Sequence, residues 1–149
     1  MKKQKLFLSI LLISAVTLTG LTLNNQIQAN NSPDLQTIMR LIMADVSMIN
    51  EGIYTQNFHL IEQGATAINQ HPPLSEETRK FIQKTLGDQM PAFGEYDKLV
   101  HNHADSIKKA AIQHDMNKVL EQYRIVQQGC VNCHASFRET IVQARSVGN

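Results

Sequence analysis

Residues 116–145, MNKVLEQYRIVQQGCVNCHASFRETIVQAR, carry apolar side chains at intervals of three and four residues. This spacing predicts a long amphipathic helix that buries one seam in a helical bundle. Asp115 directly precedes the stretch and is expected to cap the helix. The seam consists of Met116, Val119, Leu120, Tyr123, Val126, Cys130, Cys133, Phe137, Ile141 and Ala144. Both cysteines of the chain therefore lie on the side that is expected to be buried.

The sequence upstream is typical of further helices separated by Pro, Gly and polar residues. Helices are expected over residues 32–52, 57–70 and 91–114, with a shorter helix over residues 75–87. The first helix has an apolar face that is predicted to point inward, made of Leu35, Ile38, Met39, Ile42, Met43, Val46 and Ile49. Four main amphipathic helices joined by short connections predict an all-α fold, an antiparallel four-helix bundle.

The N-terminal segment has the layout of an export signal. Three lysines among the first five residues precede an apolar run over residues 6–23 and a polar stretch that ends at Ala29. This order predicts a signal peptide over residues 1–29 and a mature periplasmic domain over residues 30–149 without stable membrane insertion. The alternative is an anchor that stays in place, because the apolar run is borderline in length for a bilayer span.

Charge and composition argue against some classes of function. Removal of residues 1–29 leaves 11 Lys and Arg against 13 Asp and Glu, a net charge of −2, which argues against nucleic acid as a partner. A C-x-x-C loop is too short to staple an exported domain, so the two cysteines are expected to serve chemistry. The sequence shows no nucleophile–base constellation and no Gly-rich phosphate loop, so we do not expect an enzyme.

Cys130, Cys133 and His134 form the pattern C-x-x-C-H, which is typical of c-type haem attachment. Two thiols one helical turn apart can add to the two vinyl groups on one edge of haem, and the adjacent imidazole then reaches the iron. A core with 5% aromatic residues and no Trp would also gain a large apolar insert. We therefore expect one covalent haem c, with its iron bound by His134.

Other interpretations of the motif are weaker. A thioredoxin-like redox pair would open a helix beside a βαβ unit, and no strands are evident. A structural zinc site needs a fourth ligand, and there is no second cysteine pair. A chance occurrence of the pattern is the remaining alternative.

A methionine ligand on the other side of the iron must come from upstream, because 15 residues follow His134 and none is Met. Met39 and Met43 share one face of the first helix, one turn apart. Helix arithmetic alone leaves both open, with a slight preference for Met43. His103 is a further candidate. Arg138, one turn after His134, is expected to bind a haem propionate, to rest over the edge of the imidazole or to be an ordinary surface arginine.

The chain resembles cytochrome c′ and its low-spin relatives, the cytochromes c556. The resemblance is carried by a helical bundle whose last helix has the C-x-x-C-H motif, followed by Phe137 and Arg138. It implies that the first helix supplies the residue on the far side of the iron. An apolar residue there leaves the iron five-coordinate, whereas a methionine makes it six-coordinate. Residues 38–43, IMRLIM, resemble the second type, and the resemblance favours Met39.

The resemblance also implies features beyond the iron. Family members often carry an arginine near a propionate, one turn before the distal residue. Leu35 stands there in this chain, with Arg40 as a substitute. A homodimer formed through the first two helices is a further implication.

These observations lead to an expected function. The chain is expected to be a periplasmic electron carrier whose haem iron is bound by His and Met and exchanges electrons with redox partner proteins. The alternative is a five-coordinate module that binds or senses nitric oxide or carbon monoxide. A thiol protein without haem is the third class.

Overall fold

The computed structural model describes residues 33–147, and all regular secondary structure in this part is helical. The predicted signal peptide over residues 1–29 lies outside the described residues. The α-helices are α2 Leu35–Thr55, α3 Phe58–Gln70, α4 Glu76–Leu86, α5 Met90–Ile112, α6 Met116–Cys133 and α7 Glu139–Val147. A 3₁₀ turn, Gly87–Gln89, precedes α5, and a π-helical turn, His134–Arg138, joins α6 to α7. The all-α prediction is confirmed.

Polar side chains set the beginnings of four helices. The side chain of Asp34 accepts a hydrogen bond from the Thr37 amide at 2.8 Å and so caps α2. The side chains of Asn57, Ser75 and Asp115 cap α3, α4 and α6 in the same way. Each cap satisfies a backbone N–H that has no partner within the helix. The cap predicted at Asp115 is therefore confirmed.

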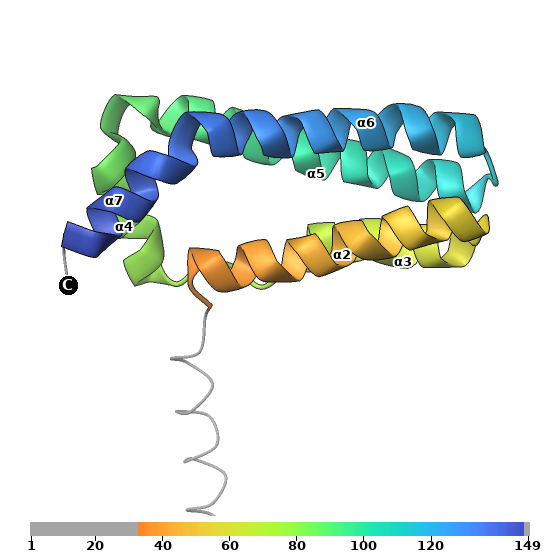
Figure 1. Cartoon of the computed structure of the whole chain (residues 1–149), viewed down its shortest axis with the longest axis horizontal. Helices are drawn as coiled ribbons and strands as arrows, with labels where there is room; N and C mark the ends of the chain where they lie inside the picture. Colours follow the sequence, from red (N-terminus) through yellow and green to blue (C-terminus); the bar gives the residue numbers. More distant parts are fainter. Residues whose placement is uncertain (1–32, 148–149) are drawn as a thin grey trace, which may run out of the picture. The chain divides into compact units, whose positions relative to one another are not determined.

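The long helices pack in a chain of neighbours (Figure 1). Helix α2 packs against α3, α3 against α5, and α5 against α6, while the shorter α4 and α7 pack against each other at one end. This arrangement encloses a main cluster of buried residues, to which every long helix contributes. It consists of Ile49, Ile61, Ala65, Ile68, Ala104, Ile107, Ala110, Ala111, Val119, Tyr123 and Val126.

A second cluster lies apart from the main cluster. Its buried residues are Ile82, Leu86 and Phe137, and Leu35, Leu74, Phe81, Met90, Phe93, Tyr96, Cys133 and Ile141 pack against them. The members come from α2, α4, α5, the end of α6, the π-helical turn, α7 and the connection before α4. The second cluster therefore draws distant parts of the sequence together around the segment that follows the cysteines.

The structure corrects four expectations about the helices. Helix α2 does not end at Gly52 but continues to Thr55. Gly52 has no side chain at the place where α3 comes close to α2. The last helix is interrupted at residues 134–138 by the π-helical turn. Met39 and Met43 do not point into the core: their side chains are 37% and 62% exposed. Leu120, which was placed on the buried seam, is likewise exposed.

The backbones of α2 and α3 approach each other closely at Gly64. A Cβ atom there would lie 2.7 Å from the Asp45 carbonyl oxygen and 3.0 Å from the Ile49 amide nitrogen. Backbone atoms cannot move aside as the end of a side chain can. The absence of a side chain at Gly64 therefore sets the spacing of the two helices.

We predict that Gly64→Ala lowers the free energy of unfolding by about 1–3 kcal/mol, the usual effect of overpacking a core. Gly94→Ala is the matched control, because Gly94 lies in α5 with no atom within 4 Å of a new Cβ. The control should be neutral or stabilise by up to about 1 kcal/mol, since alanine favours helix. Urea unfolding followed by circular dichroism measures both. Equal effects of the two variants would contradict the packing at Gly64.

Candidate functional site

The C-x-x-C-H motif lies where α6 passes into the π-helical turn. Cys133 is the last residue of α6, and His134 is the first residue of the turn that ends at Arg138. A π-helical turn holds about one residue more than an α-helical turn, and such turns occur frequently at functional sites. The path of the helix bends here as it continues into α7 (Figure 1). The turn keeps Phe137 buried while it leaves His134 and Arg138 exposed.

The two cysteines lie at the junction of the two clusters. Cys130 packs against the main cluster, and Cys133 packs against the second cluster. Both thiols are free and half-buried. A flat apolar group attached to both sulfurs would therefore contact both clusters at once. The free thiols and their apolar surroundings fit the haem that the motif predicts.

Burial keeps both thiols in the neutral form. Burial raises the pKa of Cys130 above its usual value, and burial together with the nearby Cys130 and Asp97 raises the pKa of Cys133. Thiol–disulfide exchange requires the thiolate, which helix N-termini and nearby positive charges stabilise. The motif lies at the end of α6 and not at its beginning. These features weigh against a thioredoxin-like role.

An aromatic group supports the motif from α5. The rings of Phe93 and Tyr96 meet the ring of Phe137 edge-on, with centroids 5.7 Å and 6.1 Å apart. Edge-to-face pairs of this kind add to the apolar burial of the rings. Phe137 was expected on the buried seam of the last helix, but spacing along a helix does not identify partners on another helix.

The start of α2 is tied to the segment that follows the motif. Leu35 packs against the second cluster, which contains Phe137. Arg145 of α7 donates to the Asp34 carboxylate at 2.8 Å. Met39 lies one turn after Leu35, and Met43 lies one turn further on. Helix α2 is not among the helices that pack closely against α6. The start of α2 instead contacts the segment after the motif through the second cluster and the Asp34–Arg145 ion pair.

The other predicted candidates lie in different surroundings. His103 is half-buried in α5, and its Nδ1 lies 2.6 Å from Gln122 Oε1 of α6, so it is already engaged between these helices. Arg138 is exposed and takes part in none of the salt bridges found among residues 33–147. The structure thus brings Cys130 and Cys133 together with the motif histidine, and it does not bring His103 to them.

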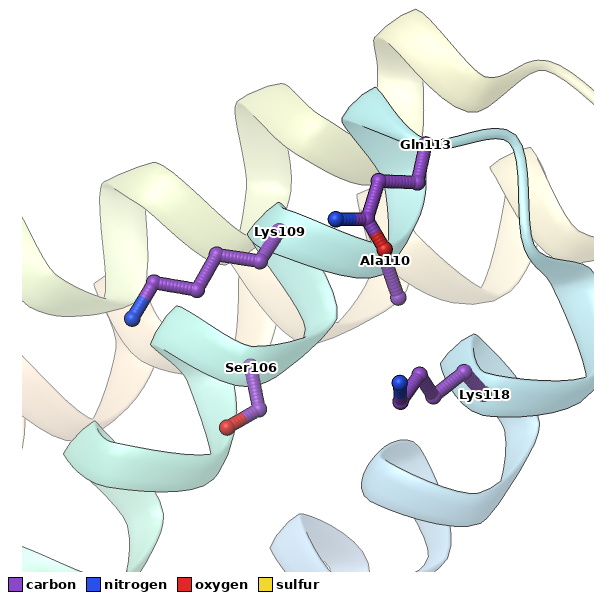
Figure 2. Close-up of a pocket in the computed structure, with 5 residues that line it drawn as sticks. All are labelled: Ser106, Lys109, Ala110, Gln113 and Lys118. Atoms are coloured by element: carbon purple, nitrogen blue, oxygen red, sulfur yellow. The ribbon is translucent and has the colours of Figure 1, made fainter.

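Two surface pockets lie in the described part of the chain. One pocket of about 220 Å³ is lined by Ser106, Lys109, Ala110 and Gln113 of α5 and by Lys118 of α6 (Figure 2). A second, of about 360 Å³, is lined by Glu95, Tyr96, Lys98, Leu99, Asn102 and His103. Neither includes a residue of the C-x-x-C-H motif.

Within residues 33–147, no group of three or more His, Cys, Asp or Glu side chains is arranged to hold a metal ion. Within the same residues, no helix has the length and apolar character needed to cross a membrane.

Comparison of the chain with known protein families, with curated proteins and with solved structures gives no match. The assignment of a function to this site therefore rests on the residues and their geometry.

The ion pair between Asp34 and Arg145 makes stability depend on pH. Hydrogen bonds from Arg145 and then from Thr37 lower the pKa of Asp34 from 3.8 to about 2. A carboxyl group with a lowered pKa stabilises the fold above about pH 4, and this contribution is lost as the pH falls through about 2. Because the pair is partly exposed, its contribution is modest.

We predict that Asp34→Asn lowers the free energy of unfolding at neutral pH by at most about 1 kcal/mol, because asparagine keeps the helix cap but loses the ion pair. The difference from the wild type should shrink between about pH 4 and pH 2. Urea unfolding across this range measures it. Glu76→Gln, which removes only pairs with Arg79 and Lys80 within one helix, is the control. A difference that persists unchanged at pH 2 would show that the ion pair is not the cause.

Proposed function

We propose that this protein is an exported c-type cytochrome with one haem, which carries single electrons between redox partner proteins in the periplasm. The observation that carries the proposal is the C-x-x-C-H motif with two free, half-buried thiols at the junction of two apolar clusters. When bound, haem supplies an iron atom that changes between the ferrous and ferric states by one electron. The protein is proposed to act as a carrier and not as an enzyme.

In this proposal Cys130 and Cys133 hold the cofactor covalently. Each thiol adds across one vinyl double bond, so that the sulfur bonds to one carbon and the hydrogen goes to the other. The addition needs no oxidant or reductant, but it needs two free thiols. The position of both cysteines on one helix, one turn apart, suits the two vinyl groups on one edge of the ring.

His134 supplies the first protein ligand to the iron. Its side chain is exposed, so it can turn toward a metal without disturbing either cluster. The neighbouring π-helical turn gives this part of the backbone a path different from that of an α-helix. Arg138 in the same turn is the proposed partner of a propionate, a role that its exposure supports.

Met39 is the proposed second ligand, with Met43 as the alternative. The anchoring of the start of α2 by Leu35 and Asp34 near Phe137 and Arg145 supports Met39, which lies closer to that end. Its smaller exposure, 37% against 62%, points the same way. A thioether ligand tends to raise the reduction potential by favouring the ferrous state.

An antiparallel four-helix bundle is the architecture proposed for the cytochrome. Gly52 of α2 meets Ile61 of α3, whereas the later Gly64 meets the earlier Ile49. Gly129 of α6 meets Leu99 of α5, whereas the earlier Gln122 of α6 contacts the later His103 of α5. This order of contacts supports opposite directions within each pair. The resemblance to cytochromes c′ and c556 further suggests a homodimer.

Covalent attachment is the first test of the proposal. The purified exported protein should gain the mass of one haem, and acid–acetone should leave the haem on the chain. Replacing Cys130 and Cys133 with serine should make any remaining haem extractable, because no thioether can form. His103→Ala should keep covalent haem, since His103 binds Gln122. Wild-type protein with extractable haem, or with a disulfide between the two cysteines, would rule out the proposal.

The optical spectrum tests the second ligand and separates the two functions. With Met39 bound, both oxidation states should be low-spin and carbon monoxide should bind slowly or not at all. Met39→Ala should then become high-spin, bind carbon monoxide and show a lower potential, whereas Met43→Ala should remain low-spin. A low-spin Met39→Ala protein beside a high-spin Met43→Ala protein would reverse the assignment. A high-spin wild type would instead indicate the gas-binding alternative.

A further inference from the structure

Two histidine side chains from different helices face each other away from the cysteine motif. His71 follows the last residue of α3, and His101 lies within α5, the helix against which α3 packs. Their Nε2 atoms are 3.3 Å apart, and the ring centroids are 5.2 Å apart. Both side chains are half-buried, so the pair is defined by packing but remains open to solvent.

The hydrogen bonds of the other ring nitrogens determine where the protons lie. His71 Nδ1 donates to the Pro72 carbonyl oxygen at 2.9 Å, and this oxygen can only accept. His101 Nδ1 lies 2.7 Å from Asn69 Oδ1, an acceptor for a proton on this nitrogen. In the tautomer in which both Nδ1 atoms carry the proton, both Nε2 atoms have lone pairs that face each other and can bind one cation.

We propose that His71 and His101 bind one divalent metal ion that prefers imidazole ligands, such as Zn²⁺, through their Nε2 atoms. Two nitrogens that each lie 2.0–2.1 Å from a tetrahedral zinc ion are about 3.3 Å apart, the spacing between these atoms. Metal-binding histidines usually donate the other ring N–H to a carbonyl or carboxylate oxygen, which fixes the ring. Pro72 and Asn69 provide such acceptors here.

An acidic side chain beside the pair favours a cation. Asp97 Oδ1 lies 3.6 Å from His101 Nε2. Only the two imidazoles are placed as direct ligands. Water completes the coordination, since no group of three or more His, Cys, Asp or Glu side chains within residues 33–147 is arranged to hold a metal ion.

Such a metal ion would join the end of α3 to the middle of α5. It would therefore stabilise the fold in proportion to its occupancy, because the site exists only in the folded state. The inference does not depend on the proposed electron transfer. It also uses none of the residues that would hold haem.

Zinc titration tests this site. The exported protein is treated with a chelator, any free thiols are alkylated so that they cannot bind zinc, and zinc chloride is added in a calorimeter. We expect one zinc ion per chain and a higher unfolding temperature with zinc. His71→Ala and His101→Ala should each weaken binding at least about tenfold. His59→Ala, which removes an exposed histidine elsewhere on α3, should bind as the wild type does.

Asn69 provides a finer test that a merely structural role would not pass. Asn69→Ala should weaken zinc binding about tenfold, whereas Asn69→Asp should bind at least as tightly, because a carboxylate also accepts the His101 proton. Circular dichroism confirms that each variant is folded. The proposal is overturned if the wild type binds no zinc at millimolar concentration. It is also overturned if His71→Ala and His101→Ala bind as tightly as His59→Ala.

Discussion

The burial of the apolar seam along α6 and the turn that follows it is the constraint on which the rest of the structure depends. Val119, Tyr123 and Val126 occupy the main cluster, whereas Phe137 occupies the second cluster. Burial of a large apolar side chain contributes roughly 1.5–3 kcal/mol, so the seam is a large part of the stability of a small domain. Because the seam passes from one cluster to the other at Cys130 and Cys133, the packing itself determines where the two sulfurs lie.

The packing of the two cysteines against different clusters matters for the proposed electron transfer. An electron carrier benefits from a rigid surround, since its metal should change oxidation state with little rearrangement of the ligands. The cysteines and histidine are held by a helix that packs against α5, and Phe93 and Tyr96 support the turn after them. The proposed methionine ligands lie on the exposed side of α2, where an added apolar group would cover them.

Much of the fold was predictable from the sequence, because helix ends and apolar spacing are local properties. The cap at Asp115 and the positions of α3, α4 and α5 follow from such signals. The end of α2 did not follow, because Gly52 is typical of a helix end, whereas here it allows α3 to approach. The π-helical turn was also missed, since a seam with intervals of three and four residues is equally typical of an unbroken helix.

In the candidate site, too, local features were predictable, whereas features that depend on packing between helices were not. The motif residues are adjacent in sequence, so the C-x-x-C-H pattern was recognisable without a structure. The pairing of His71 with His101, 30 residues apart, was not, because it depends on how α3 packs against α5. The inward placement of Met39 and Met43 was wrong, because periodicity identifies the apolar face of a helix but not what covers that face.

The most direct measurement is mass spectrometry of the tryptic peptide between Arg124 and Arg138, which contains both cysteines and the motif histidine. If the account is correct, this peptide from the exported protein carries one haem, attached at Cys130 and Cys133 through two thioether bonds. The same peptide without haem, with its cysteines as free thiols or as a disulfide, would contradict it.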